Sequence, residues 1–182
     1  VLSPRKMSVA RWVEIVGAAH SVGLRSSATI MYGHIEKPEH VAAHMGLIKR
    51  LQAETGGFTE FVPLGFIHEK NVLGNIGFSR PGPSAADDLR LIAVARLFLR
   101  PGIRNIQMSW VKMGQKLAQL ALTAGASDFG GALMEEAVIR ESGADHGETL
   151  PPETLRRLIR EMGRVPVERS TTYRVLQRFD DP

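Results

Sequence analysis

The sequence predicts an α/β fold in which about four parallel strands alternate with flanking helices. In some segments apolar residues recur every three or four positions, and these alternate with shorter segments rich in β-branched and aromatic residues. That order builds a parallel sheet through right-handed crossovers. The expected strands begin near residues 26, 58, 103 and 126, and this irregular spacing argues against a solenoid. Four strands are too few to close an eight-stranded barrel.

The first half of the chain carries clear start and stop signals. Ser8 can cap a helix that Gly23 ends. Pro38 suits the first turn of the next helix, and Gly56 and Gly57 can close it. The expected elements are a helix over residues 8–22, a strand over 24–34, a helix over 38–54 and a strand over 58–66.

The second half begins with a long loop over residues 67–83, which is rich in Gly and Pro. Ser84, with Asp87 three residues later, indicates a capped helix start. The expected elements are a helix over 84–99, a strand over 103–111, a helix over 114–123, a strand over 126–133 and a helix over 152–162. We expect residues 1–140 to form the sheet and residues 141–182 a helical extension and tail of the same domain.

Composition excludes several classes of protein. The 182 residues are 43% hydrophobic and 23% charged, as in ordinary soluble domains. No apolar run is long enough to cross a membrane, so we expect a cytoplasmic protein. The net charge of +4 suggests nucleic-acid binding, but the basic residues are scattered and aromatic residues make up only 6%. The densest basic stretch mixes with acidic residues and is typical of a solvated helix face: Arg156, Arg157, Arg160 and Arg164 beside Glu153 and Glu161.

Functional residues are expected at the carboxyl ends of the strands, where α/β proteins place their sites. The residues at these ends are Tyr32, His34, Glu36, Phe66, His68, Asn71, Ser109, Trp110, Lys112, Gly130, Gly131 and Glu135. His34 and His68 suit acid–base chemistry, although a histidine that bonds backbone at a strand end is an equal alternative. Trp110 is as suited to the core as to a substrate contact.

Other chemical motifs are weak. The chain has no Gly-rich phosphate loop and no serine in a nucleophile elbow. His40 and His44 share a helix face, but without a third ligand they are more typical of packing histidines than of a metal site. Glu135 and Glu136 are adjacent, so their side chains diverge and do not make a carboxylate pair.

Several segments together resemble a known enzyme family. They are ATIMYGHIE, GGFTEFVPLGFIHEKN, RPGP, NIQMSWVKMG, GASDFGGALMEE and RSTTYR, in this order over nearly the whole chain. They resemble the C-terminal part of the tyrosine-using radical S-adenosylmethionine half of FO synthase, which makes the deazaflavin precursor of coenzyme F-420.

The resemblance implies the later half of a radical S-adenosylmethionine (β/α) barrel. In that family an N-terminal CxxxCxxC loop holds a 4Fe-4S cluster, and cleavage of S-adenosylmethionine yields a radical that attacks tyrosine. The hydroxybenzyl part of tyrosine then joins 5-amino-6-ribitylaminouracil, and a second radical domain or protein closes the ring. This chain contains no cysteine. It is therefore expected to lack the cluster-binding half of its barrel and to be inactive alone.

The resemblance also assigns candidate site residues. Thr29 to Glu36 aligns loosely with a GxIxGxxE pattern near the adenine of the cofactor, which implies that Met31, Gly33 and Glu36 bind S-adenosylmethionine. The residues implied to line the substrate cavity are Tyr32, His34, Glu60, His68, Gln107, Ser109 and Trp110. No catalytic residue and no metal ligand is assigned within the chain.

Two other functions stay open at this point. A menaquinone-pathway relative, either aminofutalosine synthase or dehypoxanthine futalosine cyclase, shares the barrel and similar strand motifs. The runner-up from another class is a non-catalytic binding or partner module without a cluster. Half of a barrel also leaves strand edges and apolar surface open, so we expect the isolated chain to be poorly soluble or oligomeric.

Overall fold

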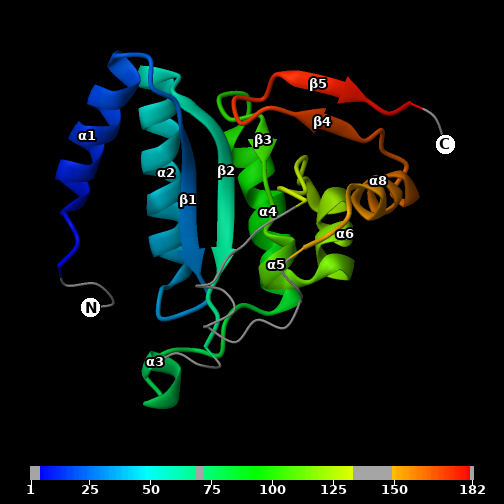
Figure 1. The fold of residues 1–182 in the computed structure, drawn as a ribbon. Helices are drawn as coiled ribbons and strands as arrows, with labels where there is room; N and C mark the ends of the chain where they lie inside the picture. The colour runs from blue at the N-terminus through cyan, green and yellow to red at the C-terminus, as the bar shows by residue number, and fades with distance from the viewer. Residues whose placement is uncertain (1–4, 69–71, 133–148, 181–182) are drawn as a thin grey trace.

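The computed structural model of the chain describes residues 5–68, 72–132 and 149–180. These residues form an α/β structure with a short parallel sheet (Figure 1). The helices are α1 (Val9–Ser21), α2 (Pro38–Thr55), α3 (Val72–Asn75), α4 (Ala85–Leu99), α5 (Trp110–Met113), α6 (Gln115–Ala124) and α8 (Pro152–Glu161). The strands are β1 (Ser26–Tyr32), β2 (Phe58–Gly65), β3 (Asn105–Ile106), β4 (Val167–Arg169) and β5 (Val175–Arg178).

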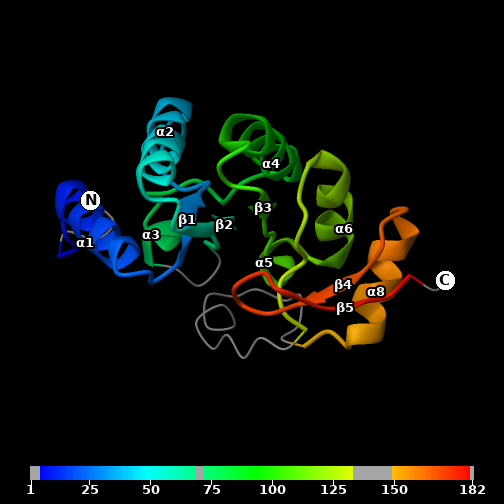
Figure 2. The ribbon, with the colours of Figure 1, turned by 90° about the horizontal axis from the view of Figure 1, so that it is seen from above.

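The parallel sheet has the order β1-β2-β3 within the described residues. Helix α2 connects β1 to β2, and α4 connects β2 to β3. Figure 2 shows α2, α4 and α6 following one another along the same side of the sheet. The crossover helices therefore cover one face only, and the other face lies on the side of the hairpin β4–β5.

The expected helix starts are confirmed by their caps. The Ser8 side chain accepts a hydrogen bond from the Arg11 amide, and Ser84 forms a capping box with Asp87. The core lies between the sheet and the helices, where alternate residues of β1 are buried. Its least exposed side chains include Ile48, Phe61, Ile92, Ile106 and Trp110.

Two expected strands need correction. The strand expected over 103–111 is limited to Asn105–Ile106, and α5 begins at Trp110 because a short apolar run is compatible with either a strand or a helix. The strand expected over 126–133 is reduced, in its described part, to one parallel bridge between Gln107 and Asp128. There the amide of Gly130 donates to Oδ1 of Asp128 at 2.8 Å and turns the chain away. The sheet thus has three strands and one bridged segment instead of four strands.

The tail contains an antiparallel hairpin that the sequence did not predict. Strands β4 and β5 are three and four residues long, and Tyr173 in their connection has a φ of 63°. A tyrosine in this left-handed conformation carries none of the Gly or Asn signal by which hairpin turns are found. The expected domain boundary at residues 140 and 141 lies outside the described residues, so it stays a prediction.

The outer edge of β1 is partly covered by a histidine. The carbonyl of Tyr32 accepts a bond from the Phe66 amide next to β2, so the carbonyl of Thr29, an odd number of residues away, points to the opposite edge. Nε2 of His44 lies 2.9 Å from that Thr29 oxygen. His40, on the same helix, bonds the Lys37 amide through Nδ1. Each ring therefore has a structural partner, as the packing interpretation of these histidines expects.

None of the described helices is long and apolar enough to cross a membrane.

Candidate functional site

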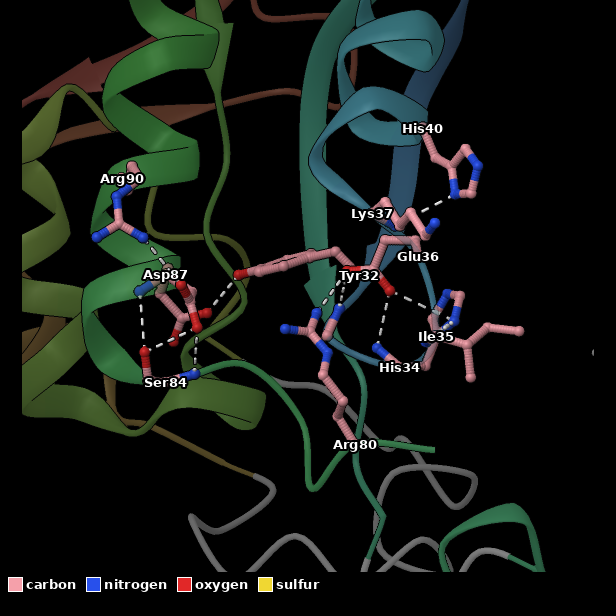
Figure 3. Close-up of polar contacts among 12 residues, drawn as sticks. Tyr32, His34, Ile35, Glu36, Lys37, His40, Arg80, Ser84, Asp87 and Arg90 are labelled. Carbon is pink, nitrogen blue, oxygen red and sulfur yellow. Dashed lines mark hydrogen bonds and ion pairs between the residues drawn. The ribbon is translucent and has the colours of Figure 1, made fainter. Parts of the chain in front are cut away.

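The loop that follows β1 is folded tightly against the loop that precedes α4. Gly33 has a φ of +89°, and a Cβ placed there would lie 2.4 Å from Cδ of Pro83. The Arg80 amide also donates to the carbonyl of His34 at 2.8 Å. Gly33 is required here for its left-handed conformation and for the close approach of Pro83. Figure 3 shows the side chains of both loops meeting at this end of the sheet.

Glu36 holds this loop in place. Its carboxylate accepts hydrogen bonds from the amides of Gly33 at 2.6 Å and His34 at 2.9 Å, and Arg80 donates to it at 3.0 Å (Figure 3). Burial alone would raise the pKa of Glu36, but the amide hydrogen bonds outweigh it and lower that pKa. The carboxylate is therefore charged at neutral pH, and its oxygens already accept hydrogen bonds from Gly33, His34 and Arg80.

His34 is buried at the same loop. Its Nδ1 accepts a hydrogen bond from the Ile35 amide at 2.7 Å, while a carboxylate oxygen of Glu36 lies 3.4 Å from it. The shorter bond requires a lone pair on Nδ1, so the proton of the neutral ring sits on Nε2. The ring meets Phe66 edge to face at 5.9 Å. Nε2 is thus the ring atom left to donate a hydrogen bond.

Tyr32 points away from the open face of the sheet and toward α4. Its hydroxyl donates to Oδ1 of Asp88 at 2.5 Å. Burial, and then the charge of Asp88, raises the pKa of Tyr32. Burial also raises the pKa of Asp88 to about 6, although the tyrosine hydrogen bond opposes the shift. This buried pair ties the end of β1 to the first turn of α4.

A second polar group lies on the sheet face turned toward the hairpin. Asp128 is buried, and its Oδ2 accepts hydrogen bonds from Arg169 Nε and from the Tyr173 hydroxyl, each at 2.5 Å. Arg169 also donates to Oε1 of Gln107 at 3.2 Å, and its guanidinium lies 4.0 Å from the Tyr173 ring centre. These bonds connect the hairpin to Gln107, which directly follows β3, and to Asp128 in the neighbouring segment.

Glu60 lies near the polar group formed by Asp128, Arg169 and Tyr173. It pairs in register with Asn105, two residues before Gln107, so all three face the same side of the sheet. Its carboxylate accepts a hydrogen bond from the Thr59 hydroxyl. Burial first, then Asp128 and more weakly Glu60, raises the pKa of Tyr173. Glu60 and Gln107, both expected in a substrate cavity, thus lie near one another.

The other expected site residues are dispersed. Met31 is 47% exposed and faces away from the core, whereas Trp110 is fully buried and donates from Nε1 to the Gly131 carbonyl at 3.1 Å. Ser109 is buried at the start of α5, and His68 is half-buried just beyond β2. Asn71 and Glu135, expected at the same rim, lie outside the described residues. The site assignments therefore stay predictions.

Sequence reasoning missed Asp88, Arg80, Asp128, Arg169 and Tyr173 as members of these groups. Arg80, Asp128, Arg169 and Tyr173 all lie in segments of the resemblance, RPGP, GASDFGGALMEE and RSTTYR, but none of them received a role, and Asp88 lies in none of these segments. Within the described ranges, no three His, Cys, Asp or Glu side chains gather in a way that could hold a metal ion.

Fold and site together define an α/β protein with crossover helices on one face of a parallel sheet and buried polar groups at its carboxyl end and on its open face. The profile of the CofH/MqnC C-terminal region matches residues 55–181. The chain belongs to this family.

Curated relatives share high identity with the chain. The 5-amino-6-(D-ribitylamino)uracil–L-tyrosine 4-hydroxyphenyl transferase of Archaeoglobus fulgidus is 53% identical over 176 residues, which cover 97% of this chain and 50% of that protein. The transferase of the same name from Methanothermobacter thermautotrophicus is 48% identical over 177 residues, 97% of this chain and 48% of that protein. That from Methanopyrus kandleri is 49% identical over 172 residues, 94% and 47% respectively. The chain thus spans about half the length of these relatives.

Proposed function

We propose that this chain forms the carboxyl-terminal half of a radical S-adenosylmethionine barrel that joins the hydroxybenzyl part of tyrosine to 5-amino-6-ribitylaminouracil. The observation that carries the proposal is the 53% identity to the Archaeoglobus transferase over 97% of the chain. The fold supports it, because parallel strands with all crossover helices on one side are what a segment of a (β/α) barrel looks like.

In this proposal the open face of the sheet contributes to the substrate cavity. A uracil and a ribityl chain need several hydrogen-bonding partners, and Glu60 and Gln107 offer a carboxylate and an amide on that face. Arg169 fixes the Gln107 oxygen, and Asp128 in turn fixes Arg169. The hairpin therefore acts as support for the polar groups that meet the substrate.

The residues present do not fit the iron–sulfur cluster of such an enzyme. Its ligands would be cysteine thiolates, and the chain has none. In the proposal those ligands lie outside these 182 residues. S-adenosylmethionine fits only in part: the exposed, apolar Met31 suits contact with a flat ring, whereas the amides of Gly33 and His34 are bonded to Glu36. When bound, S-adenosylmethionine would supply the radical that attacks tyrosine.

The partners follow from the same proposal. Tyrosine and 5-amino-6-ribitylaminouracil are the substrates, and a second radical S-adenosylmethionine domain or protein closes the ring. A further barrel segment would pair with the outer edge of β1.

A chimera tests the function. This chain replaces the matching half of the 53% identical Archaeoglobus transferase, which serves unaltered as the positive control. With tyrosine, 5-amino-6-ribitylaminouracil, S-adenosylmethionine and a reductant, we expect the chimera to form the coupled product, measured by mass spectrometry. A folded chimera with its cluster that acts only on a futalosine precursor, or on neither substrate, would contradict the proposal.

The same chimera tests the open face of the sheet. Glu60→Gln removes the carboxylate charge but keeps the shape of the side chain, so we expect kcat/KM for the aminouracil to fall about tenfold or more, the loss of a charged hydrogen bond. Glu168→Gln, on exposed β4, is the matched control and should leave kcat/KM unchanged. Equal kcat/KM values for the two variants would remove Glu60 from the substrate cavity.

A further inference from the structure

A cavity of about 580 Å³ opens at the end of the sheet opposite the Tyr32–Glu36 loop. Its lining comes from the last turn of α4, the connection between α4 and β3, the connection between α6 and Asp128, and the residues after α8. The first two connections lead into β3 and into the segment bridged to it at Asp128, so the cavity lies at the end of the sheet where β3 begins. Four arginines line it: Arg96, Arg100, Arg104 and Arg164.

Two of the four arginines are held by the carbonyls of helix ends and loops. Arg96 donates from Nε to the Gly125 carbonyl at 2.6 Å, from Nη1 to the Arg104 carbonyl at 2.5 Å and from Nη2 to Ser127 Oγ at 3.0 Å. Arg164 donates to the Leu122 carbonyl at 3.0 Å. These bonds cover the carboxyl end of α6, whose dipole would otherwise repel an anion.

The side chains of the other two arginines have no partner among the described residues. Arg100 and Arg104 are exposed, and neither has a side-chain hydrogen bond or ion pair with any part of the chain that the structure describes. Among the described residues that line the cavity there is no carboxylate. Elsewhere the chain pairs many of its arginines with Asp or Glu, namely Arg11, Arg80, Arg90, Arg156, Arg157, Arg169 and Arg178.

Four arginines therefore line the cavity, and no acidic side chain among the described lining residues balances their charge. Partial burial first, and then the charges of Arg100 and Arg164, lowers the pKa of Arg96. The four guanidinium groups repel one another across the cavity, and an anion between them would relieve that repulsion.

We propose that this cavity binds a phosphate group, either free phosphate or the phosphate of a small molecule. Guanidinium groups bind phosphate through paired N–H donors, and a tetrahedral dianion has enough oxygens for arginines from separate connections. The volume lies in the range of small-molecule sites. No aromatic side chain lines the cavity, so the phosphate, not a base or ring, carries the recognition. The site is independent of the proposed transferase function.

Calorimetric titration of the full chain tests the site, with inorganic phosphate and pyrophosphate added at constant ionic strength. We expect saturable binding at one site. The double variant Arg100→Gln/Arg104→Gln should weaken it at least tenfold, because both guanidinium groups are lost while no side-chain bond within the described residues is broken. Arg25→Gln/Arg50→Gln removes the same charge from two exposed arginines outside the cavity and should change the affinity less than twofold.

The affinities for phosphate and for pyrophosphate together show which kind of phosphate group the site binds. Tighter binding of pyrophosphate indicates a diphosphate-bearing molecule, and equal binding indicates a single phosphate group; both support the site. Absence of saturable binding, or equal weakening in the two double variants, would overturn it. If circular dichroism shows that Arg100→Gln/Arg104→Gln is unfolded, the single variants replace it, each with an expected loss of about threefold or more.

Discussion

The two ends of the parallel sheet differ in how their charged side chains are paired. At the carboxyl end of β1, Glu36 is bonded to two amides and to Arg80, and Tyr32 is bonded to Asp88. At the opposite end, Arg100 and Arg104 face a cavity whose described lining residues include no carboxylate. Charge at the first end holds two loops together. Charge at the second end stabilises nothing within the described chain, so it is available to a ligand.

The two ends also differ in which bonds within the chain a ligand must displace in order to bind. A molecule that binds to the amides of Gly33 and His34 must first displace the Glu36 carboxylate. An anion at the arginine cavity meets no carboxylate among the described lining residues. Substitutions at the carboxyl end should therefore change stability, whereas substitutions at the other end should change binding.

The largest expected effect is that of Gly33→Ala. The left-handed conformation costs a non-glycine residue about 1–2 kcal/mol, and the overlap with Pro83 adds about 1–3 kcal/mol. We expect the free energy of unfolding, measured by urea denaturation, to fall by about 2–5 kcal/mol. Gly23→Ala is the matched control, because Gly23 has a φ of +85° but no atom within 4 Å of its added Cβ. Equal losses in the two variants would show that the contact with Pro83 contributes nothing.

Asp88 should give the carboxyl end a pH-dependent stability. The pKa of its carboxyl is about 6 in the folded chain against an ordinary value of 3.8, so between about pH 4 and 6 the folded state holds a proton that the unfolded state has lost. Stability therefore falls as pH rises through this range, by at most about 1.4 kcal/mol per pH unit from this group. Asp88→Asn should remove this contribution in urea titrations from pH 4 to 7.

Asp87→Asn serves as the control for that slope. Hydrogen bonds from Ser84 lower the pKa of Asp87, so its own titration lies below this pH range. Most of the slope should remain in Asp87→Asn. If Asp88→Asn keeps the slope of the wild type, the Tyr32–Asp88 pair does not titrate as described.

Glu36→Gln should have an intermediate effect. The amide still accepts hydrogen bonds but loses the charge that strengthens them, so we expect a loss of about 1 kcal/mol at pH 7. Because the pKa of Glu36 is lowered on folding, its contribution in the wild type is present at neutral pH and is lost as pH falls below about 4.5, the ordinary value of a glutamate carboxyl. Urea denaturation at pH 7 and pH 3.5 measures both effects.

Arg80→Gln removes the ion pair of Glu36 but keeps its hydrogen bonds from the amides, so it measures what the ion pair contributes to stability. The Arg80 side chain is 54% exposed, so its ion pair should contribute about 0.5 kcal/mol or less. A loss in Arg80→Gln as large as that in Glu36→Gln would show that the ion pair, and not the amide bonds, holds the loop.

The smallest effect on stability is expected for Arg100→Gln/Arg104→Gln. Neither side chain is bonded within the described chain, so the melting temperature without phosphate should change little, or rise slightly at low salt as repulsion is relieved. Added phosphate should raise the melting temperature of the wild type only. Marked destabilisation of the variant without phosphate would remove the contrast between the two ends.

Local signals in the sequence predicted most of the fold. The caps Ser8 and Ser84 and the first-turn proline Pro38 determine where helices begin, and they act over three or four residues that the sequence shows directly. The hairpin β4–β5 and helix α5 could not be predicted in the same way. The hairpin depends on contacts of Tyr173 and Arg169 with Asp128, more than 40 residues earlier in the chain.

The candidate site was predicted less completely than the fold. Gly33, His34 and Glu36 were correctly expected to lie together at the end of a strand, since they are adjacent in the sequence. Their partners could not be predicted, because Arg80 is 44 residues from Glu36 and Asp88 is 56 residues from Tyr32. Gly33 was expected to bind S-adenosylmethionine, but in the structure Pro83 packs directly against it.

The bond between His44 and the Thr29 carbonyl makes the ring a reporter of the state of β1. A strand that pairs with the outer edge of β1 brings its own amide to that carbonyl and displaces the imidazole. The nitrogen chemical shifts of His44 should then move toward those of a solvated ring. A single side chain would in this way tell whether β1 lies at the border of its sheet or inside a larger one.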